Sequence, residues 1–159
     1  MIIASLSENK EIEKRLAVTP EITKKYIDLG LSLLLPKNYG SHLGFDDNEY
    51  KSLGANFFDS DEKIINDADI IIQLGMLEEK KLSLLRENQT LIGSLDSFSN
   101  KEKIKALNSK KVNCFSLEML PRITRAQSMD ILSSQANLAG YKAVLDSFSF
   151  FQKAIPMMM

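Results

Sequence analysis

A short polar segment, from Pro121 to Asp130, carries the side chains with the most evident chemistry in this chain of 159 residues. It holds two arginines, a glutamine and an aspartate: Arg122, Arg125, Gln127 and Asp130. Arginine offers a rigid fork of donors, glutamine offers a donor and an acceptor, and an ionised aspartate accepts hydrogen bonds. The segment comes just before a long helical pattern, so we expect these side chains to converge on one small ligand.

The same segment also fits a purely structural role. Ser128 or Asp130 would serve as the N-cap of the helix that follows, and arginines are commonly solvated at protein surfaces. Short motifs carry a substantial risk of false assignment, so composition alone leaves both interpretations open.

Composition and charge narrow the class of protein. The chain has 20 basic and 21 acidic side chains and a formal net charge of -1, which argues against nucleic acid or a basic membrane-binding face. No apolar stretch reaches the roughly 18 residues of a spanning helix, and no signal peptide is evident. Cys114 cannot form an intrachain disulfide, and His42 has no second ligand for a metal. We therefore expect a soluble protein of the reducing cytoplasm with no metal.

The elements that must position the polar segment alternate along the chain. Five runs are typical of strands, several of them apolar on both faces as in a buried parallel sheet: 1–6, 31–35, 70–74, 90–94 and 112–117. Five segments between them are amphipathic at helical spacing: 21–29, 47–53, 61–66, 78–86 and 101–108. This alternation predicts an α/β fold, a Rossmann-like parallel sheet flanked by helices.

Local signals fix the ends of the first helix and set apart the last one. Thr19 before Pro20 is typical of an N-cap and a first helical residue, and Gly30 is placed to close that helix in the left-handed conformation. Residues 128–153 predict one long helix that is apolar on two sides. The apolar tail 154–159 then suggests a chain cut ahead of a further domain. We expect a domain over residues 1–127 and a connecting helix and truncated tail over 128–159.

The polar segment and the start of the long helix, residues 121–141, resemble the NAD-binding alpha subunit of proton-translocating NAD(P) transhydrogenase. Earlier segments support the resemblance: Lys14–Pro20 is similar to the family's E-x-R-V-A-x-x-P segment, and Gly40, Gly44–Asp47 and Leu53–Ala55 match its next stretch. The resemblance covers the whole chain. The glycine-rich G-x-G-x-x-G turn that cradles the dinucleotide phosphates is absent from this sequence, so it would belong to a following domain.

This resemblance implies a function and a set of site residues. The intact enzyme transfers hydride from NADH to NADP+, coupled to proton translocation, and Arg122, Gln127 and Asp130 would contact the nicotinamide, with Ser133 and Tyr141 in support. NAD(H) would bind the intact subunit and NADP(H) a partner domain. The expected partners are the missing NAD-binding domain, the NADP(H)-binding and membrane domains, and a second copy of the subunit. The chain alone should be inactive, and the intact component peripheral to the inner membrane.

Two alternatives stay open. Arg15 resembles the arginine that binds the substrate carboxylate in alanine dehydrogenase, a relative with the same fold. The lysine and histidine that complete that site correspond here to Gln73 and Asp96, which supply neither an ammonium nor an imidazole. In the second alternative the chain is a non-catalytic module whose long helix binds a partner protein.

Overall fold

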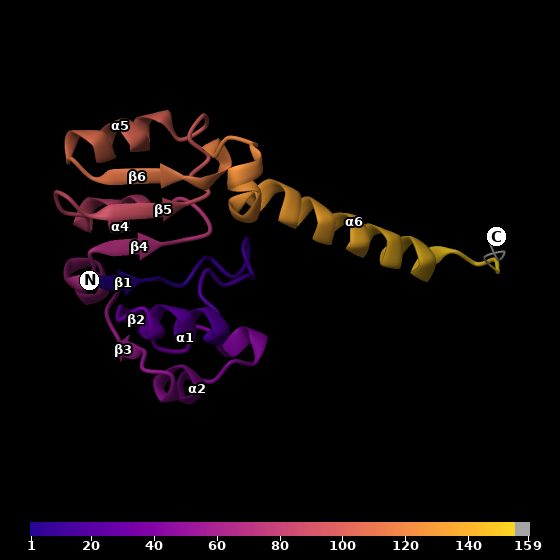
Figure 1. The fold of residues 1–159 in the computed structure, drawn as a ribbon, viewed down its shortest axis with the longest axis horizontal. Helices are drawn as coiled ribbons and strands as arrows, with labels where there is room; N and C mark the ends of the chain where they lie inside the picture. Colours follow the sequence, from indigo (N-terminus) through magenta and orange to yellow (C-terminus); the bar gives the residue numbers. More distant parts are fainter. Residues whose placement is uncertain (155–159) are drawn as a thin grey trace. The chain divides into compact units, whose positions relative to one another are not determined.

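The computed structural model describes residues 1–154, and their contacts divide the chain into two compact units, the first from Met1 to Leu117 and the second from Glu118 onward. Within the described residues of the first unit, six parallel strands form one sheet in the order β3-β2-β1-β4-β5-β6 (Figure 1). The strands are β1 (Ile2–Ala4), β2 (Ser32–Pro36), β3 (Asn56–Phe58), β4 (Ile70–Ile72), β5 (Thr90–Gly93) and β6 (Asn113–Ser116). The predicted Rossmann-like class is confirmed.

Helices connect successive strands and cover both faces of the sheet. They are α1 (Pro20–Asp28), α2 (Asp47–Ser52), α3 (Asp61–Asp67), α4 (Glu79–Leu84) and α5 (Lys101–Ser109), with a short 3-10 turn, η1 (Ser41–Leu43), before α2. One apolar core includes side chains of α3, α4 and α5, and the other includes side chains of α1 and α2. The sheet therefore lies between two helical layers.

The strands alternate between these two cores residue by residue. In β1, Ile3 belongs to the core under α1 and α2, whereas Ala4 belongs to the core under α3, α4 and α5. In β2, Leu33 and Leu35 face the first of these cores and Leu34 the second. Because neighbouring residues of a strand point to opposite faces, a sheet covered on both sides requires continuous apolar runs. That requirement is the physical reason why the strands could be recognised in the sequence.

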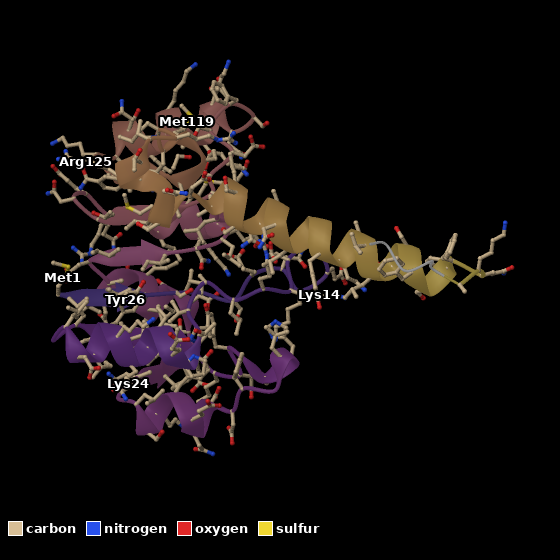
Figure 2. All side chains as sticks on the ribbon, turned by 45° about the vertical axis from the view of Figure 1, so that its right-hand side comes forward. Met1, Lys14, Lys24, Tyr26, Met119 and Arg125 are labelled. Carbon is tan, nitrogen blue, oxygen red and sulfur yellow. The ribbon has the colours of Figure 1, made fainter. Side chains whose placement is uncertain are left out.

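The first helix has the ends that the sequence predicts. The Thr19 hydroxyl accepts a hydrogen bond from Ile22 N at 3.4 Å, Pro20 opens the helix, and Gly30 has a φ of 77°. An L side chain at that φ is strained, and glycine is not. Figure 2 labels two residues that divide α1 into its faces: Tyr26 packs against the core, and Lys24 is exposed to solvent.

One strand was not predicted from the sequence. β3 has three residues, none of them fully buried, and it pairs with β2 at the edge of the sheet through Leu34 and Asn56, Leu35 and Phe57, and Pro36 and Phe58. A short edge strand has one neighbour and one incomplete cover, so it lacks the apolar run that marks a central strand. The predicted first strand is also shorter than expected, since β1 covers only Ile2–Ala4 of residues 1–6.

The second unit contains two 3-10 segments and one long helix. η2 (Leu117–Met119) straddles the unit boundary, and η3 (Thr124–Met129) leads into α6 (Ile131–Phe150). The predicted helix over 128–153 is thus shorter at both ends, and its first residues adopt 3-10 geometry. Residues of α6 are exposed apart from the partly buried Ile131, which agrees with a helix that carries apolar side chains on more than one side. The predicted apolar tail falls mainly on residues 155–159, outside the described residues.

Candidate functional site

The second unit brings four of the predicted site residues to one place. Arg122, Gln127, Asp130 and Ser133 line an open depression of about 340 Å³, together with Ile123 and Thr124. The 3-10 turn η3 carries Gln127, the residues before it carry Arg122, and the first turn of α6 carries Ser133. Tyr141, the fifth predicted site residue, does not line this depression and lies further along α6 with 67% of its surface exposed.

The local sequence explains why the depression forms. Ile123 is extended, and the tight 3-10 turn that follows is closed by a hydrogen bond from Ala126 N to Ile123 O at 2.9 Å. Ala126 is the buried residue of this turn, at 6% exposure. Its small methyl anchors the turn while the polar neighbours Arg125 and Gln127 stay at the surface.

Asp130 holds the junction between the turn and α6. Its Oδ1 accepts hydrogen bonds from Leu132 N and Ser133 N, both at 3.0 Å, and its Oδ2 accepts one from the Ser133 hydroxyl at 2.6 Å. The hydrogen bond from Ser133 is the main reason why the pKa of Asp130 lies below its ordinary value, and the charge of Arg122 lowers it further. Asp130 is therefore the N-cap of α6, as the structural interpretation expected, and it is an anion at neutral pH.

The capping role does not use up the acceptor capacity of Asp130. A carboxylate offers about four lone pairs, and the three hydrogen bonds within the chain leave room for one more. Among residues 1–154, the side-chain amide of Gln127 and the guanidinium of Arg122 make no hydrogen bond. The depression thus presents a free amide, a free cation and an oriented anion to a ligand.

The positions that resemble an amino-acid dehydrogenase have a different chemistry. The Arg15 guanidinium is held by Glu13, with Nη2 to Oε2 at 2.6 Å and Nε to Oε1 at 2.9 Å. Gln73 is 3% exposed, and its Oε1 accepts from Leu6 N at 3.2 Å. Asp96 is exposed in the turn after β5, where its main-chain oxygen accepts from Asn100 N at 2.9 Å.

The remaining singled-out side chains have structural partners. His42 Nε2 lies 2.8 Å from the main-chain oxygen of Lys14, and in the described portion of the chain no three His, Cys, Asp or Glu side chains gather as metal ligands would. Cys114 is half-buried instead of enclosed, and burial raises the pKa of its thiol. No helix within residues 1–154 combines the length and the apolar character needed to cross a membrane.

Sequence reasoning missed a second hollow, in the first unit, where β1 and β4 end. Its lining comes from residues just after these two strands and includes Glu8 and Gln73, which are far apart in the chain. The chain runs from β1 outward through β2 to β3 and then returns to β4, so the direction of winding changes between β1 and β4. Ligands of open parallel sheets bind at such a switch point. Only the strand order could have indicated this hollow.

A parallel sheet wound in both directions from its centre and covered by helices defines a Rossmann-like α/β domain. The chain belongs to the family described as alanine dehydrogenase/PNT, N-terminal domain, whose model matches residues 5–139. This match includes the hollow at the switch point and most of the depression at the start of α6.

Transhydrogenases are among the similar proteins. The first portion of NAD(P) transhydrogenase subunit alpha from Rickettsia prowazekii is 39% identical over 162 residues, which cover 99% of this chain and 42% of the relative. A crystal structure of transhydrogenase from Sinorhizobium meliloti superimposes with a TM-score of 0.89 at 36% identity and covers 100% of this chain and 47% of the other. The chain thus spans less than half the length of these relatives.

Alanine dehydrogenases are more distant. Alanine dehydrogenase 1 of Staphylococcus aureus is 27% identical over 145 residues, which cover 91% of this chain and 38% of that protein. The identity is lower than for the transhydrogenases, in agreement with the changed residues at positions 73 and 96.

Proposed function

We propose that this chain is the N-terminal portion of the NAD(H)-binding component of an NAD(P) transhydrogenase, which transfers hydride between NADH and NADP+ coupled to proton translocation. The observation that carries the proposal is the grouping of Arg122, Gln127, Asp130 and Ser133 around one depression. The similarity to transhydrogenase alpha subunits along the whole chain supports it.

The donors and acceptors of the depression fit a nicotinamide head group. The free Gln127 amide can match a carboxamide in kind, since both groups carry one carbonyl oxygen and one NH2. The remaining acceptor site of Asp130 can receive the carboxamide NH2, and its negative charge favours the cationic, oxidised ring. Arg122 adds a fork of donors at the rim of the same depression.

A bound nicotinamide donates or accepts the hydride at its C4 carbon. The residues of this chain then have three tasks: they bind the ring, fix its orientation and help to exclude water. No proton has to be moved at a substrate carbon, so a titrating histidine or cysteine is not needed in the depression. The side chains that line it meet this requirement.

The phosphates and riboses of NAD(H) would be bound elsewhere in the longer protein. No G-x-G-x-x-G turn occurs in the sequence, and most of the affinity for a dinucleotide comes from its pyrophosphate and ribose contacts. We infer that the isolated chain binds NADH weakly and is inactive. In the intact enzyme the partners would be the following NAD-binding domain, an NADP(H)-binding domain and a membrane domain that holds the component at the cytoplasmic face, with a second copy as a further partner.

The alanine dehydrogenase alternative is disfavoured by a specific observation. A substrate carboxylate would need a free cation, but Arg15 is bound by Glu13 through two hydrogen bonds, and Gln73 brings no charge. The alternative of a protein-interaction module is supported by the exposed apolar residues of α6, such as Leu138 at 58% and Phe148 at 53%. Hydride transfer by the longer protein would decide against both.

The test compares two arginines of the same segment in the longer protein. We expect Arg122→Ala and Gln127→Ala to slow hydride transfer about tenfold, the effect of losing one hydrogen bond of about 1.4 kcal/mol, with little change in NADH affinity. Arg125→Ala is the matched control, because Arg125, labelled in Figure 2, is exposed and does not line the depression. Single-turnover stopped-flow kinetics would measure the rate, and fluorescence titration the affinity.

Two results would contradict the proposal. One is a large loss of NADH affinity with an unchanged transfer rate in the Gln127 variant. The other is an equal effect of the Arg122 and Arg125 substitutions, because that would make the depression irrelevant to the reaction.

A further inference from the structure

The hollow at the ends of β1 and β4 has a volume of about 370 Å³. The loop after β1 forms one wall, and the residues from Gln73 to Glu78 form the other. In Figure 1 the loop after β1 lies beyond the arrowheads of the strands, on the carboxyl-end side of the sheet, and Lys14 in Figure 2 marks this loop. This hollow lies in the first compact unit, so its chemistry is independent of the function proposed for the depression in the second unit.

Gln73 gives the hollow a hydrogen-bond donor of fixed orientation. Its Oε1 accepts hydrogen bonds from Leu6 N at 3.2 Å and from the Ser5 hydroxyl at 3.3 Å. Because a main-chain N–H can only donate, the side-chain atom that faces Leu6 N must be the oxygen. The NH2 group of Gln73 therefore points away from these partners.

This NH2 group has no partner within residues 1–154, although Gln73 is only 3% exposed. Among the described residues, the side-chain atom that is both fully enclosed and without a hydrogen bond is Asp47 Oδ1, so Gln73 Nε2 is not sealed in the interior. Gln73 lines the hollow. Its amide donor is thus available to a ligand there, and a buried donor without an acceptor is costly.

A buried network holds Gln73 in this orientation. The single proton of the Ser5 hydroxyl is used on Gln73, so in the 2.8 Å hydrogen bond between Ser5 and Tyr39 the Tyr39 hydroxyl is the donor. The Tyr39 oxygen in turn accepts from Val18 N at 3.2 Å. Every member of this relay is buried. A fully satisfied buried network is rigid, so the donor at the base of the hollow is preorganised.

The walls of the hollow are acidic. Glu8 is pinned there, because its Oε1 accepts from Leu74 N at 2.7 Å and from Gly75 N at 3.4 Å. The lining also contains Glu13, Glu78 and one cation, Lys81. Lys81 is paired with Asp61 at 2.9 Å, and Glu13 is paired with Arg15. Within residues 1–154, Glu8 forms no ion pair, so its carboxylate is the negative charge available to a ligand.

We propose that this hollow binds a small organic cation that carries a hydrogen-bond acceptor. Its ammonium group pairs with Glu8, its acceptor receives the hydrogen bond of Gln73 Nε2, and its apolar part contacts Ile12, Leu74 and Leu77. A ligand with a carboxylate is repelled, because the cations near the walls are already bound to acidic side chains.

The experiment uses four probes of similar size on the 159-residue chain. Glycinamide has both the ammonium and the carbonyl, ethylamine has only the ammonium, acetamide has only the amide, and glycine adds a carboxylate. Nuclear magnetic resonance would follow the amides of Leu74, Gly75 and the Gln73 side chain. We expect millimolar binding of glycinamide, weaker binding of ethylamine and acetamide, and the weakest binding of glycine.

Variants assign the contacts. Glu8→Gln keeps an acceptor for Leu74 N and removes the charge, so glycinamide should bind about tenfold more weakly. Glu11→Gln is the control, because Glu11 is exposed on the same loop and does not line the hollow. Gln73→Met should reduce the affinity for glycinamide to that for ethylamine.

The proposal is overturned if glycine or acetate binds as tightly as glycinamide, if none of the probes shifts these amides, or if Glu8→Gln and Glu11→Gln have equal effects. If the Gln73 variant fails to fold, the four probes and the Glu8 variant still decide the outcome.

Discussion

Gly93, near the carboxyl end of β5, offers a sharp test of how tightly the sheet is packed beside the switch point. A Cβ added at this position would lie 2.4 Å from the main-chain oxygen of Gln73 and 3.2 Å from its carbonyl carbon. Both atoms belong to backbone, which cannot turn aside as a side chain can. The neighbouring hydrogen bonds, Gln73 N to Ile92 O at 2.9 Å and Ser94 N to Leu74 O at 3.2 Å, hold the two segments together.

The cost of Gly93→Ala follows from this geometry. Real Cβ atoms essentially never approach another heavy atom within 3.0 Å, so the two chain segments must move apart by at least about 0.6 Å. That movement stretches the flanking hydrogen bonds, and overpacking of a well-packed interior costs about 1 to 3 kcal/mol. We expect a loss near 3 kcal/mol, which for a unit of this size corresponds to a decrease in Tm of roughly 12 °C.

Thermal unfolding followed by circular dichroism would measure the effect, with Gly30→Ala as the matched control. The added methyl at Gly30 meets no atom within 4 Å, so only the left-handed backbone, with its φ of 77°, is unfavourable. This should cost about 1 kcal/mol. The reasoning is refuted if Gly93→Ala loses no more stability than Gly30→Ala, since the sheet would then accept the methyl without strain.

Two further predictions concern ionisable groups. Asp130→Asn should preserve the helicity of α6, because asparagine is also a good N-cap, whereas Asp130→Ala should reduce it in far-ultraviolet circular dichroism; equal spectra would contradict the capping role. The pKa of Asp130 is lowered by folding, mainly by the hydrogen bond from Ser133, so its contribution to stability is complete above the ordinary value of 3.8 and is lost as the pH falls through the folded pKa. The pKa values of Tyr39 and Tyr50 are raised from 10.0 by burial, so their contribution is present below that pH and is lost at more alkaline pH. Denaturant unfolding at about pH 8 and about pH 11 should show this loss, and Tyr50→Phe should reduce it; an unchanged alkaline loss in that variant would assign it elsewhere.

The fold class was predictable because its signals are local. A strand between two helical layers must be apolar on both faces, and the runs at β2 and β4 carry that signal in five consecutive residues or fewer. The ends of α1 were predictable because Thr19, Pro20 and Gly30 act on the backbone beside them. β3 was not predictable, because its pairing with β2 depends on a neighbour more than 20 residues away.

The candidate nicotinamide site was predictable for a similar reason. Arg122, Gln127, Asp130 and Ser133 lie within 12 residues, and a turn followed by a helix keeps such side chains close. The sequence could not decide how Asp130 divides its oxygens between the cap and a ligand, since both interpretations use the same carboxylate. The assignment of the nicotinamide contacts stays a prediction, and so does the division of the chain at residue 127.

The sequence by itself determined the alternation of strands and helices, the ends of α1 and the clustering of polar groups before α6, because each depends on neighbours along the chain. Tertiary structure alone decided the strand order, and with it the meeting of Glu8 and Gln73 at the switch point. Those residues are separated by 65 positions, and no local pattern links them. They come together because two parallel strands end at the same edge of the sheet, which is a property of the folded chain.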